Sequence, residues 1–599
     1  MPDTIIKPLS LKGGEFLIKD ATADATFIPE DINEEQSMVR GMVKDFVENE
    51  VMAQYDRIEK QEEGVTLGLL RKAGELGILG AHMPAEFGGM ELDNNTNTFI
   101  ADEIGVTSSW SVSFAAHTGI GMLPILYFGT DEQKQKYLPD LITGNLAAAY
   151  CLTEPSSGSD ALAAKSNAVL SEDGQYYILN GQKMWITNSG FADIFIVFAK
   201  IDGDKFTGFI VERGLDGLSL GAEEDKLGIK GSSTRQVFFE NVKVPVSNLL
   251  GEIGKGHLIA FNALNTGRFK LGALCLGGAK GSATTAIKYA NERVQFGTPI
   301  SNFGAMKYKI AEQAVRIFAG ESAQFRTSQL MEEKKEQLVA EGASFGEAKL
   351  GAAEEYSIEC ALLKVIGSEV LDYVVDETVQ IHGGMGYSEE GTAARGYRDA
   401  RINRIYEGTN EINRLLAVDQ LFRKALKGGL DIVGPAWEVQ KELTSMPSLS
   451  QPEGAYAAEK KAVKEFKKAL LMVAGAAAKM QMEGQLNLKT EQEIVTNVAN
   501  MMTETFQAES LLLRVEKLAG RDTRVPQEVY DAILQVYLAD STARLNKEAT
   551  DALASFAEGD LLRTLLMGLK RFTKYPTLNV RNLRRTIADY LIEKNAYTL

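Results

Sequence analysis

Four short runs determine the fold class of this chain: QYYILNG (175–181), DIFIVFAKI (193–201), FTGFIVE (206–212) and RQVFFENVKV (235–244). They are rich in β-branched and aromatic residues, and DG, GDK and GSS turn signals lie between them. This pattern predicts a β domain. Before and after it, apolar residues recur at spacings of three to four, which is typical of amphipathic helices.

The helical parts divide into several blocks. LGLLRKAGELGILG (67–80) and TDEQKQKYLPDLITG (130–144) both end in a glycine stop, and helical periodicity resumes near residue 256 after the β domain. We therefore expect an α+β chain. Its predicted order is an irregular segment 1–33, an N-terminal helical domain 34–149, a β-barrel-like middle domain 150–255, a helical bundle 256–430, a Pro-, Ser- and Gly-containing linker 431–454, and an additional helical domain 455–599.

Composition excludes several classes of protein. The 599 residues are too many for one hydrophobic core, and 45% hydrophobic with 24% charged residues describes a soluble globular protein. A net charge of -17 disfavours nucleic acid and anionic lipid as general partners, since both are repelled at long range. Cys151, Cys275 and Cys360 are far apart and set among apolar residues, so we expect buried thiols rather than disulfides or a metal site.

The N-terminal sequence MPDTIIKPLSLKGGEFLI has the features of neither a signal peptide nor an organelle presequence. We also find no window of roughly 20 apolar residues that would span a bilayer. A cytoplasmic bacterial enzyme is the simplest interpretation. A mitochondrial matrix protein whose presequence has been removed would look similar.

The stretch RDARINRIYEGTNEINR (398–414) contains the candidate for catalysis. It places the carboxylate of Glu407 beside Gly408 and Thr409 in a segment that is otherwise mostly basic and apolar. A glycine at this point permits a positive φ or a close approach of backbone to a ligand. The alternative is that Glu407 is a surface residue paired with Arg404.

Four further motifs join this stretch in order: AYCLTEPSSGSD (149–160), KMWITN (183–188), RVQFGTPI (293–300) and QIHGGMGY (380–387). With these motifs the chain resembles the acyl-CoA dehydrogenase family over about residues 35–425. The closest likeness is to the very-long-chain branch, which is similar in CLTEPSSGSD, in LNTGRF (264–269) and in a helical region after the catalytic core. The resemblance implies FAD as the cofactor.

For this family the implied reaction is α,β-dehydrogenation of a fatty acyl-CoA in β-oxidation. A base removes the proton next to the thioester while a hydride leaves the next carbon, and only a cofactor can accept the hydride. The resemblance assigns the base to Glu407, and burial would raise its pKa toward operating pH. Some branches place the base at the position of Gly267, which has no carboxylate here.

The resemblance also assigns the binding residues. For the isoalloxazine ring these are Tyr150, Leu152, Thr153, Gly158, Ser159, Trp185, Ile186 and Thr187. The rest of FAD is held partly by a neighbouring subunit, which implies an oligomer, and a homodimer in the long branch. The further cofactor-binding residues are Arg293, Gln295, Phe296, Gln380, Gly383, Gly384, Thr409, Asn410 and Glu411. The acyl-CoA contacts are Ser159, Asn265, Arg268, Tyr406 and Gly408. No metal ligands are expected.

Two of these residues have plain alternatives. Trp185 would also suit the core of the β domain, and Arg268 would also suit a solvated surface position.

A preference for long acyl chains is predicted from the extra domain and from small residues expected to line the acyl cavity, namely Ala115, Ala116, Gly119 and Gly121.

The expected electron acceptor is an electron-transfer flavoprotein. An acyl-CoA oxidase that uses O₂ shares the fold and the base, and a non-catalytic assembly factor for a respiratory complex is an alternative from another class.

The segment 421–443 is a candidate for weak membrane contact through Leu421, Leu426, Leu430, Ile432, Val433 and Trp437. Its basic enrichment is slight, so a helix packed on its own protein is the favoured interpretation.

Overall fold

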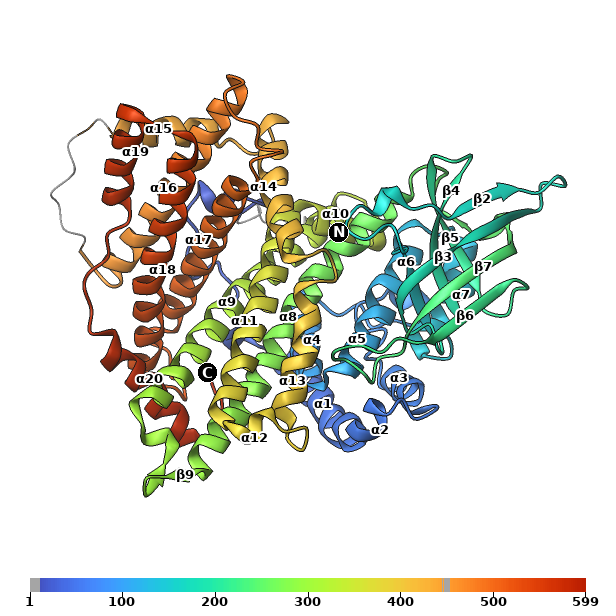
Figure 1. Cartoon of the computed structure of the whole chain (residues 1–599), viewed down its shortest axis with the longest axis horizontal. Helices are drawn as coiled ribbons and strands as arrows, with labels where there is room; N and C mark the ends of the chain where they lie inside the picture. Colours follow the sequence, from blue (N-terminus) through green and yellow to red (C-terminus); the bar gives the residue numbers. More distant parts are fainter. Residues whose placement is uncertain (1–10, 444, 446–452) are drawn as a thin grey trace, which may run out of the picture.

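The computed structural model describes residues 11–443, 445 and 453–599. Figure 1 shows a β-sheet at one end, a group of C-terminal helices at the other, and long helices between them. The predicted α+β order of helical, β and two helical regions is confirmed. The three long central helices are α8 (Gly256–Glu292), α9 (Gly304–Ala340) and α11 (Ser357–His382).

The N-terminal region forms the helical layer beside the sheet. Asn33 caps its first helix. The Asn33 side chain accepts a hydrogen bond from the backbone N–H of Gln36, and the Gln36 side chain accepts one from the backbone N–H of Asn33. The helices are α1 (Glu34–Phe46), α2 (Tyr55–Glu59), α3 (Val65–Glu75), α4 (Asn94–Ile104), α5 (Ser109–Ala115), α6 (Leu123–Phe128) and α7 (Asp131–Thr143), with the turns η6 (Gly105–Thr107) and η7 (Ala116–Gly121).

One stretch here corrects the expectation that no apolar window is long enough for a membrane span. Ser109–Phe128 passes that test by length and composition, and it is the one such stretch among the described residues. However, 72% of its window is buried inside the protein. Its apolar character therefore fits a core position between the sheet and α8.

The sheet has eight strands in the order β6-β7-β3-β2-β4-β5-β8, with β1 paired in parallel to β4. The strands are β1 (Ala148–Cys151), β2 (Asn167–Leu170), β3 (Tyr176–Thr187), β4 (Ile194–Ile201), β5 (Lys205–Glu212), β6 (Leu218–Glu223), β7 (Thr234–Pro245) and β8 (Leu249–Leu250). The four predicted runs are β3, β4, β5 and β7. The other four escaped prediction because β1, β2 and β8 are very short and no residue of β6 is fully buried.

Small residues let α8 and α11 pack closely. A Cβ on Gly367 would lie 2.7 Å from the carbonyl oxygen of Gly272. Around this pair lie α10 (Phe345–Glu355), α12 (Gly384–Tyr387), α13 (Thr392–Ala400), η11 (Arg401–Arg404) and α14 (Asn410–Leu426). A hairpin of β9 (Val294–Gln295) and β10 (Thr298–Pro299) projects after α8.

The predicted linker 431–454 contains a helix, α15 (Val433–Leu443). Its proline, Pro435, lies in the first turn, where the missing N–H costs no hydrogen bond, and Val439 is buried. Gly434 and Pro435 thus lie at the start of a helix, and the other two prolines of the predicted linker, Pro447 and Pro452, lie outside the described residues. After it follow α16 (Ala457–Met482), α17 (Gln492–Leu518), α18 (Gln527–Phe556), α19 (Gly559–Phe572) and α20 (Val580–Lys594).

The residues proposed for membrane contact divide into two groups. Leu421 and Leu430 are buried, and Ile432 packs against the core. Leu426 is 84% exposed, and Val433 and Trp437 are also exposed. The segment therefore packs on its own protein with one side and leaves three large apolar side chains on the surface.

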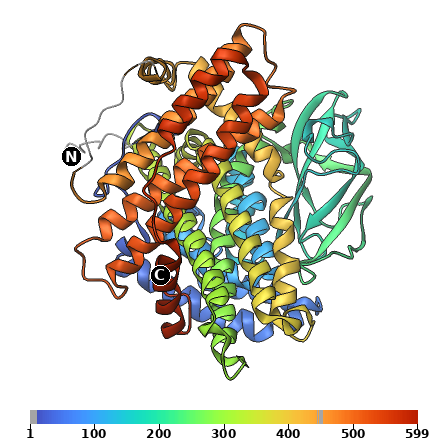
Figure 2. The same ribbon diagram turned by 60° about the vertical axis from the view of Figure 1, so that its left-hand side comes forward.

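The C-terminal helices lie against the central bundle on the side away from the sheet (Figure 2). The N-terminal segment helps to join them: the rings of Phe16 and Phe506 lie 4.7 Å apart, and Glu30 accepts hydrogen bonds from Arg514 at 2.7 Å. Arg514 also donates to Glu321 of α9 at 2.7 Å. This buried arginine connects three parts of the chain that are distant in sequence.

Candidate functional site

Glu407 lies in the turn between η11 and α14, in a conformation that few non-glycine residues adopt. Its φ is +58°, and Gly408 follows with φ +81°. The amide of Asn413, a fully buried residue, donates to the carbonyl oxygens of Glu407, Gly408 and Thr409. Arg268 donates through Nε to the same Glu407 carbonyl at 3.1 Å. These contacts hold the strained turn in place.

The carboxylate of Glu407 points at α8. A Cβ on Gly267 would lie 2.7 Å from Oε2 of Glu407, so the glycine provides the space that the carboxylate occupies. Among the described residues Oε2 has no hydrogen-bond partner, although it is buried. The alternative of a surface pair with Arg404 is wrong, because Arg404 pairs with Asp372 at 3.2 Å.

Burial raises the pKa of Glu407 to about 7, and the charges of Arg268 and Lys364 act in the opposite direction. A carboxylate with a pKa near 7 accepts a proton readily at neutral pH, which suits a general base. Lys364 is fully buried and donates to Asn410 at 2.7 Å. Sequence reasoning found neither residue: Lys364 acts through a contact between α11 and α14, and Asn413 bonds the backbone of the turn that precedes it.

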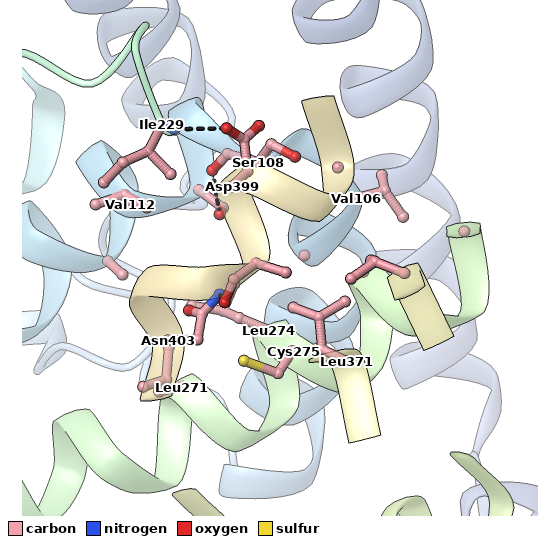
Figure 3. A pocket seen from close by; sticks show the side chains of 18 of the residues that line it. Val106, Ser108, Val112, Ile229, Leu271, Leu274, Cys275, Leu371, Asp399 and Asn403 are labelled. Carbon is pink, nitrogen blue, oxygen red and sulfur yellow. Dashed lines mark hydrogen bonds between the residues drawn. The ribbon is translucent and has the colours of Figure 1, made fainter. Parts of the chain in front are cut away.

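Glu407 lines a cavity of about 350 Å³, which Figure 3 shows from close by. Its walls come from η6 and α5 on one side, α8 and α11 on another, and α13 with η11 on a third. Its apolar lining residues include Val106, Val112, Ala115, Ala116, Ile120, Leu271, Leu274, Cys275, Leu371 and Val375. All three cysteines of the chain are buried and unpaired, as predicted.

The cavity follows one face of α8 from Gly267 to Thr285. At 1.5 Å per residue these positions span about 27 Å. Ala115 and Ala116 line it as predicted, whereas the prediction for Gly119 and Gly121 is wrong, since neither is among its lining residues. Gly121 instead packs on Ala148, whose Cβ lies 2.7 Å from the Cβ position of the glycine.

The residues assigned to the isoalloxazine ring lie on two adjacent segments. Trp185 sits in the irregular part of β3 with φ +60°, and its side chain is 53% exposed, so the core alternative is wrong. The backbone N–H of Met184 donates to the carbonyl of Thr153, which joins the strand to the loop after β1. Thr187 lines the cavity that contains Glu407.

These segments fit a planar cofactor. An exposed indole on a distorted strand offers a flat apolar surface, and a Cβ on Gly158 would meet nothing within 4 Å. The loop itself is fixed by a buried ion pair in which Lys183 donates to Glu154 at 2.7 Å, while Glu154 also accepts from the backbone of Ser166. Bound FAD would supply a hydride acceptor beside the cavity.

Two assigned residues near the ring have their polar atoms engaged elsewhere. The hydroxyl of Tyr150 donates to the carbonyl of Ala260, and the side chain of Asn410 is bonded to Lys364, Ser368 and Glu369. Thr409 caps α14 by accepting from Ile412. Leu152 and Ile186 lie in the loop and strand described above, while Glu411 is exposed.

The remaining cofactor residues are not brought together with Glu407 in one chain. Arg293, Gln295 and Phe296 lie on the β9–β10 hairpin, where Phe296 is 94% exposed. Gln380, Gly383 and Gly384 are also exposed, at the end of α11 and the start of α12. Nearby, His382 bonds the carbonyl of Thr378, and no group of three or more His, Cys, Asp or Glu in the described residues could hold a metal ion.

The residues assigned to acyl-CoA lie close to Glu407, except for Ser159. Arg268 is buried and bonded to Asn265 at 3.0 Å as well as to Glu407, which rules out the solvated alternative. Tyr406 lines the cavity and donates to Asn403 at 2.7 Å. Ser159 is exposed on the loop after β1, and Gly408 extends the turn.

Models of one protein family match most of the chain. The acyl-CoA dehydrogenase N-terminal domain matches residues 33–145, the middle domain 149–242, and two C-terminal domain models 254–422 and 465–571. A probable acyl-CoA dehydrogenase of Bacillus subtilis (strain 168) is 45% identical over 591 residues, 98% of each chain. The human mitochondrial very long-chain specific acyl-CoA dehydrogenase is 40% identical over 426 residues, covering 68% of this chain and 61% of that protein.

A solved structure extends the likeness to the whole fold. The crystal structure of an acyl-CoA dehydrogenase complexed with FAD from Bacillus anthracis has a TM-score of 0.95 and 45% identity, and the match covers 98% of this chain and 100% of that one. The family predicted from the motifs is confirmed. This chain belongs to the acyl-CoA dehydrogenase family, whose members are FAD-dependent oxidoreductases.

Proposed function

We propose that this protein dehydrogenates long-chain acyl-CoA to the trans-2-enoyl-CoA, with Glu407 as the base, in fatty acid β-oxidation. One observation carries the proposal: an unpartnered, buried carboxylate oxygen of Glu407 lies at one end of a long apolar cavity. The flavin-side residue Thr187 lines the same cavity. A substrate between these two walls has the base on one side and the hydride acceptor on the other.

The chain's own groups define the proton transfer. The Glu407 carboxylate takes the proton from the carbon next to the thioester carbonyl, and FAD accepts the hydride from the following carbon. Negative charge then develops on the thioester oxygen, where a backbone N–H such as that of Glu407 would stabilise it. Arg268 and Asn413 keep the base in position through the Glu407 carbonyl.

The length of the cavity supports a long acyl chain. An extended hydrocarbon of about 20 carbons matches a span of about 27 Å. The far end is more polar, with Ser282 donating to or accepting from Thr378 at 2.9 Å and Thr285 nearby. A series of acyl-CoA substrates tests the preference: kcat/KM should rise toward sixteen carbons, and a maximum at four carbons would contradict it.

We infer that the reduced flavin passes electrons to an electron-transfer flavoprotein. Support comes from the Bacillus subtilis and human relatives cited above, which are both named dehydrogenases. Turnover with palmitoyl-CoA under air and without added acceptor is the test. Little hydrogen peroxide is expected, whereas peroxide formed in step with enoyl-CoA would identify an oxidase.

We further propose a cytoplasmic homodimer that contacts membranes only weakly. The exposed hairpin with Phe296 supports the dimer, since an apolar side chain so exposed in a single chain suits a contact with a second one. Exposed Leu426, Val433 and Trp437 support the membrane contact. Sedimentation velocity should give twice the mass of the chain, and flotation with neutral vesicles should recover a minor fraction of the protein.

A further inference from the structure

A second strained residue lies on the wall of the cavity, opposite the helical segment that leads to Glu407. Ile229 has a φ of +47°, a region that β-branched residues rarely occupy because Cβ and the backbone collide. It is buried and belongs to the connection between β6 and β7, in the middle domain. Such a conformation persists only where the surroundings hold it.

The carboxylate of Asp399 is what holds it. The backbone N–H of Ile229 donates to Oδ1 of Asp399 at 2.5 Å, as Figure 3 shows. Asp399 is 5% exposed and lies in the last turn of α13, in the segment that continues to Glu407. Its other oxygen, Oδ2, has no partner among the described residues. The charged groups around it are Arg395, Arg398 and Glu59.

The connection is docked on the helices at two further points. A Cβ on Gly228 would lie 2.4 Å from the carbonyl oxygen of Arg398, and one on Gly231 would lie 2.7 Å from that of Ile58. No side chain fits between the backbones at either glycine. The connection therefore packs directly on the backbones of α13 and α2.

The same connection is bonded to the strand assigned to the flavin. The backbone N–H of Asn188, which directly follows Thr187, donates to the carbonyl of Ser233 at 2.9 Å. Thr187 itself pairs with Thr234 in the sheet. Asp399 thus links the segment of the base to the strand beside the cofactor site through one hydrogen bond across two domains.

We propose that Asp399 is a positioning residue that sets the flavin-side strand against Glu407 by holding Ile229 in its strained conformation. The inference rests on the proposed function where it is tested by the rate of flavin reduction, but not where it is tested by FAD affinity and flavin dichroism. Two properties follow. An uncharged side chain at position 399 that accepts the hydrogen bond from Ile229 should position the strand as Asp399 does. If the strain at Ile229 is removed, this hydrogen bond should no longer be needed.

The experiment uses the full-length holoprotein with five variants: Asp399→Ala, Asp399→Asn, Ile229→Gly, the double variant Asp399→Ala with Ile229→Gly, and Asp225→Ala. Asp225 is a matched control because it is an exposed carboxylate in the same connection, paired only at 3.9 Å with Lys230. Three quantities are measured: the FAD dissociation constant, the visible circular dichroism of the bound flavin, and its anaerobic reduction rate by palmitoyl-CoA.

Asp399→Ala should slow flavin reduction by about 10- to 100-fold and alter the flavin dichroism, because small displacements of reacting groups have effects of that size. Asp399→Asn should stay close to the parent protein, since its amide oxygen still accepts from Ile229. In the double variant, Ile229→Gly should restore most of the flavin reduction rate that Asp399→Ala loses, because glycine adopts this φ without cost. Asp225→Ala should change nothing.

If Asp399→Ala does not fold, Gly228→Ala replaces it, because its Cβ presses on the Arg398 carbonyl while Asp399 stays intact. Gly41→Ala, in open space on α1, is its control. A parent-like rate, dichroism and FAD affinity in Asp399→Ala would overturn the proposal, as would a double variant no better than the single one. If no acyl-CoA reduces the flavin of the parent protein, the proposed function fails, while FAD affinity and dichroism still decide the role of Asp399.

Discussion

The substrate end and the cofactor end of the site differ in how far a single chain completes them. Glu407, Gly267 and the walls of the cavity come together within one chain. The hairpin residues assigned to FAD lie in the open, with Phe296 94% exposed. One chain thus builds the substrate end by itself, whereas the proposed homodimer would complete the cofactor end with a second chain.

Glu407→Gln breaks the substrate end alone and should have the largest effect. The amide keeps the volume but cannot accept the proton, so flavin reduction should fall by about 10²- to 10⁴-fold. FAD content and palmitoyl-CoA affinity should stay close to those of the parent protein. Stopped-flow absorbance measures the rate, and equilibrium titration measures the binding. Near-normal reduction would show that Glu407 is not the base.

Arg293→Met breaks the cofactor end alone. Loss of an arginine that binds a diphosphate should weaken FAD by about 10- to 100-fold. With saturating FAD, reduction by palmitoyl-CoA should recover. Lys288→Met is the matched control, because Lys288 is also exposed and lies in the last part of α8. Equal FAD affinity in the two variants would place the diphosphate elsewhere.

Thr285→Phe sharpens the account of the substrate end by filling its far part. Palmitoyl-CoA should then lose about 10- to 100-fold in kcat/KM, since rejection by an apolar pocket reaches that size, while butyryl-CoA keeps its value. Thr285→Val, which preserves the shape, is the control and should leave both substrates unchanged. If Thr285→Phe slows both substrates equally, the acyl chain does not reach Thr285.

The smallest effect concerns pH. Glu407 must be ionised to act, and burial raises its pKa to about 7, so reduction should rise with pH through 7 and then level off. Lys364 lowers that pKa and keeps its own charge below about pH 8, where its pKa lies. Lys364→Met should therefore move the midpoint upward and slow reduction a few-fold at pH 7. A midpoint that stays or falls would contradict this.

Local sequence patterns were sufficient for most of the fold. The change from helical to strand periodicity located β3, β4, β5 and β7. α15 was missed because Pro435 and its neighbouring glycine are read locally as a linker, whereas the buried Val439 depends on tertiary packing. Gly119 and Gly121 were misplaced because η7 is not a regular α-helix, which changes the face that each residue presents.

For the site, the sequence was informative where a motif was continuous. Glu407, Thr187 and Tyr406 all line one cavity. The residues that hold this arrangement were not predictable: Lys364 reaches Asn410, Asp399 reaches Ile229, and Lys183 reaches Glu154. Each contact joins segments that only the folded chain brings together, and nothing in the local pattern distinguishes these residues from ordinary surface charges.

The most direct test of the central claim is anaerobic titration of the FAD-bound protein with palmitoyl-CoA and, separately, butyryl-CoA, followed by flavin absorbance. The account predicts that palmitoyl-CoA bleaches the flavin at about one equivalent per site and that butyryl-CoA does so weakly or slowly. A flavin that stays oxidised with palmitoyl-CoA, or one that only butyryl-CoA bleaches, would contradict it.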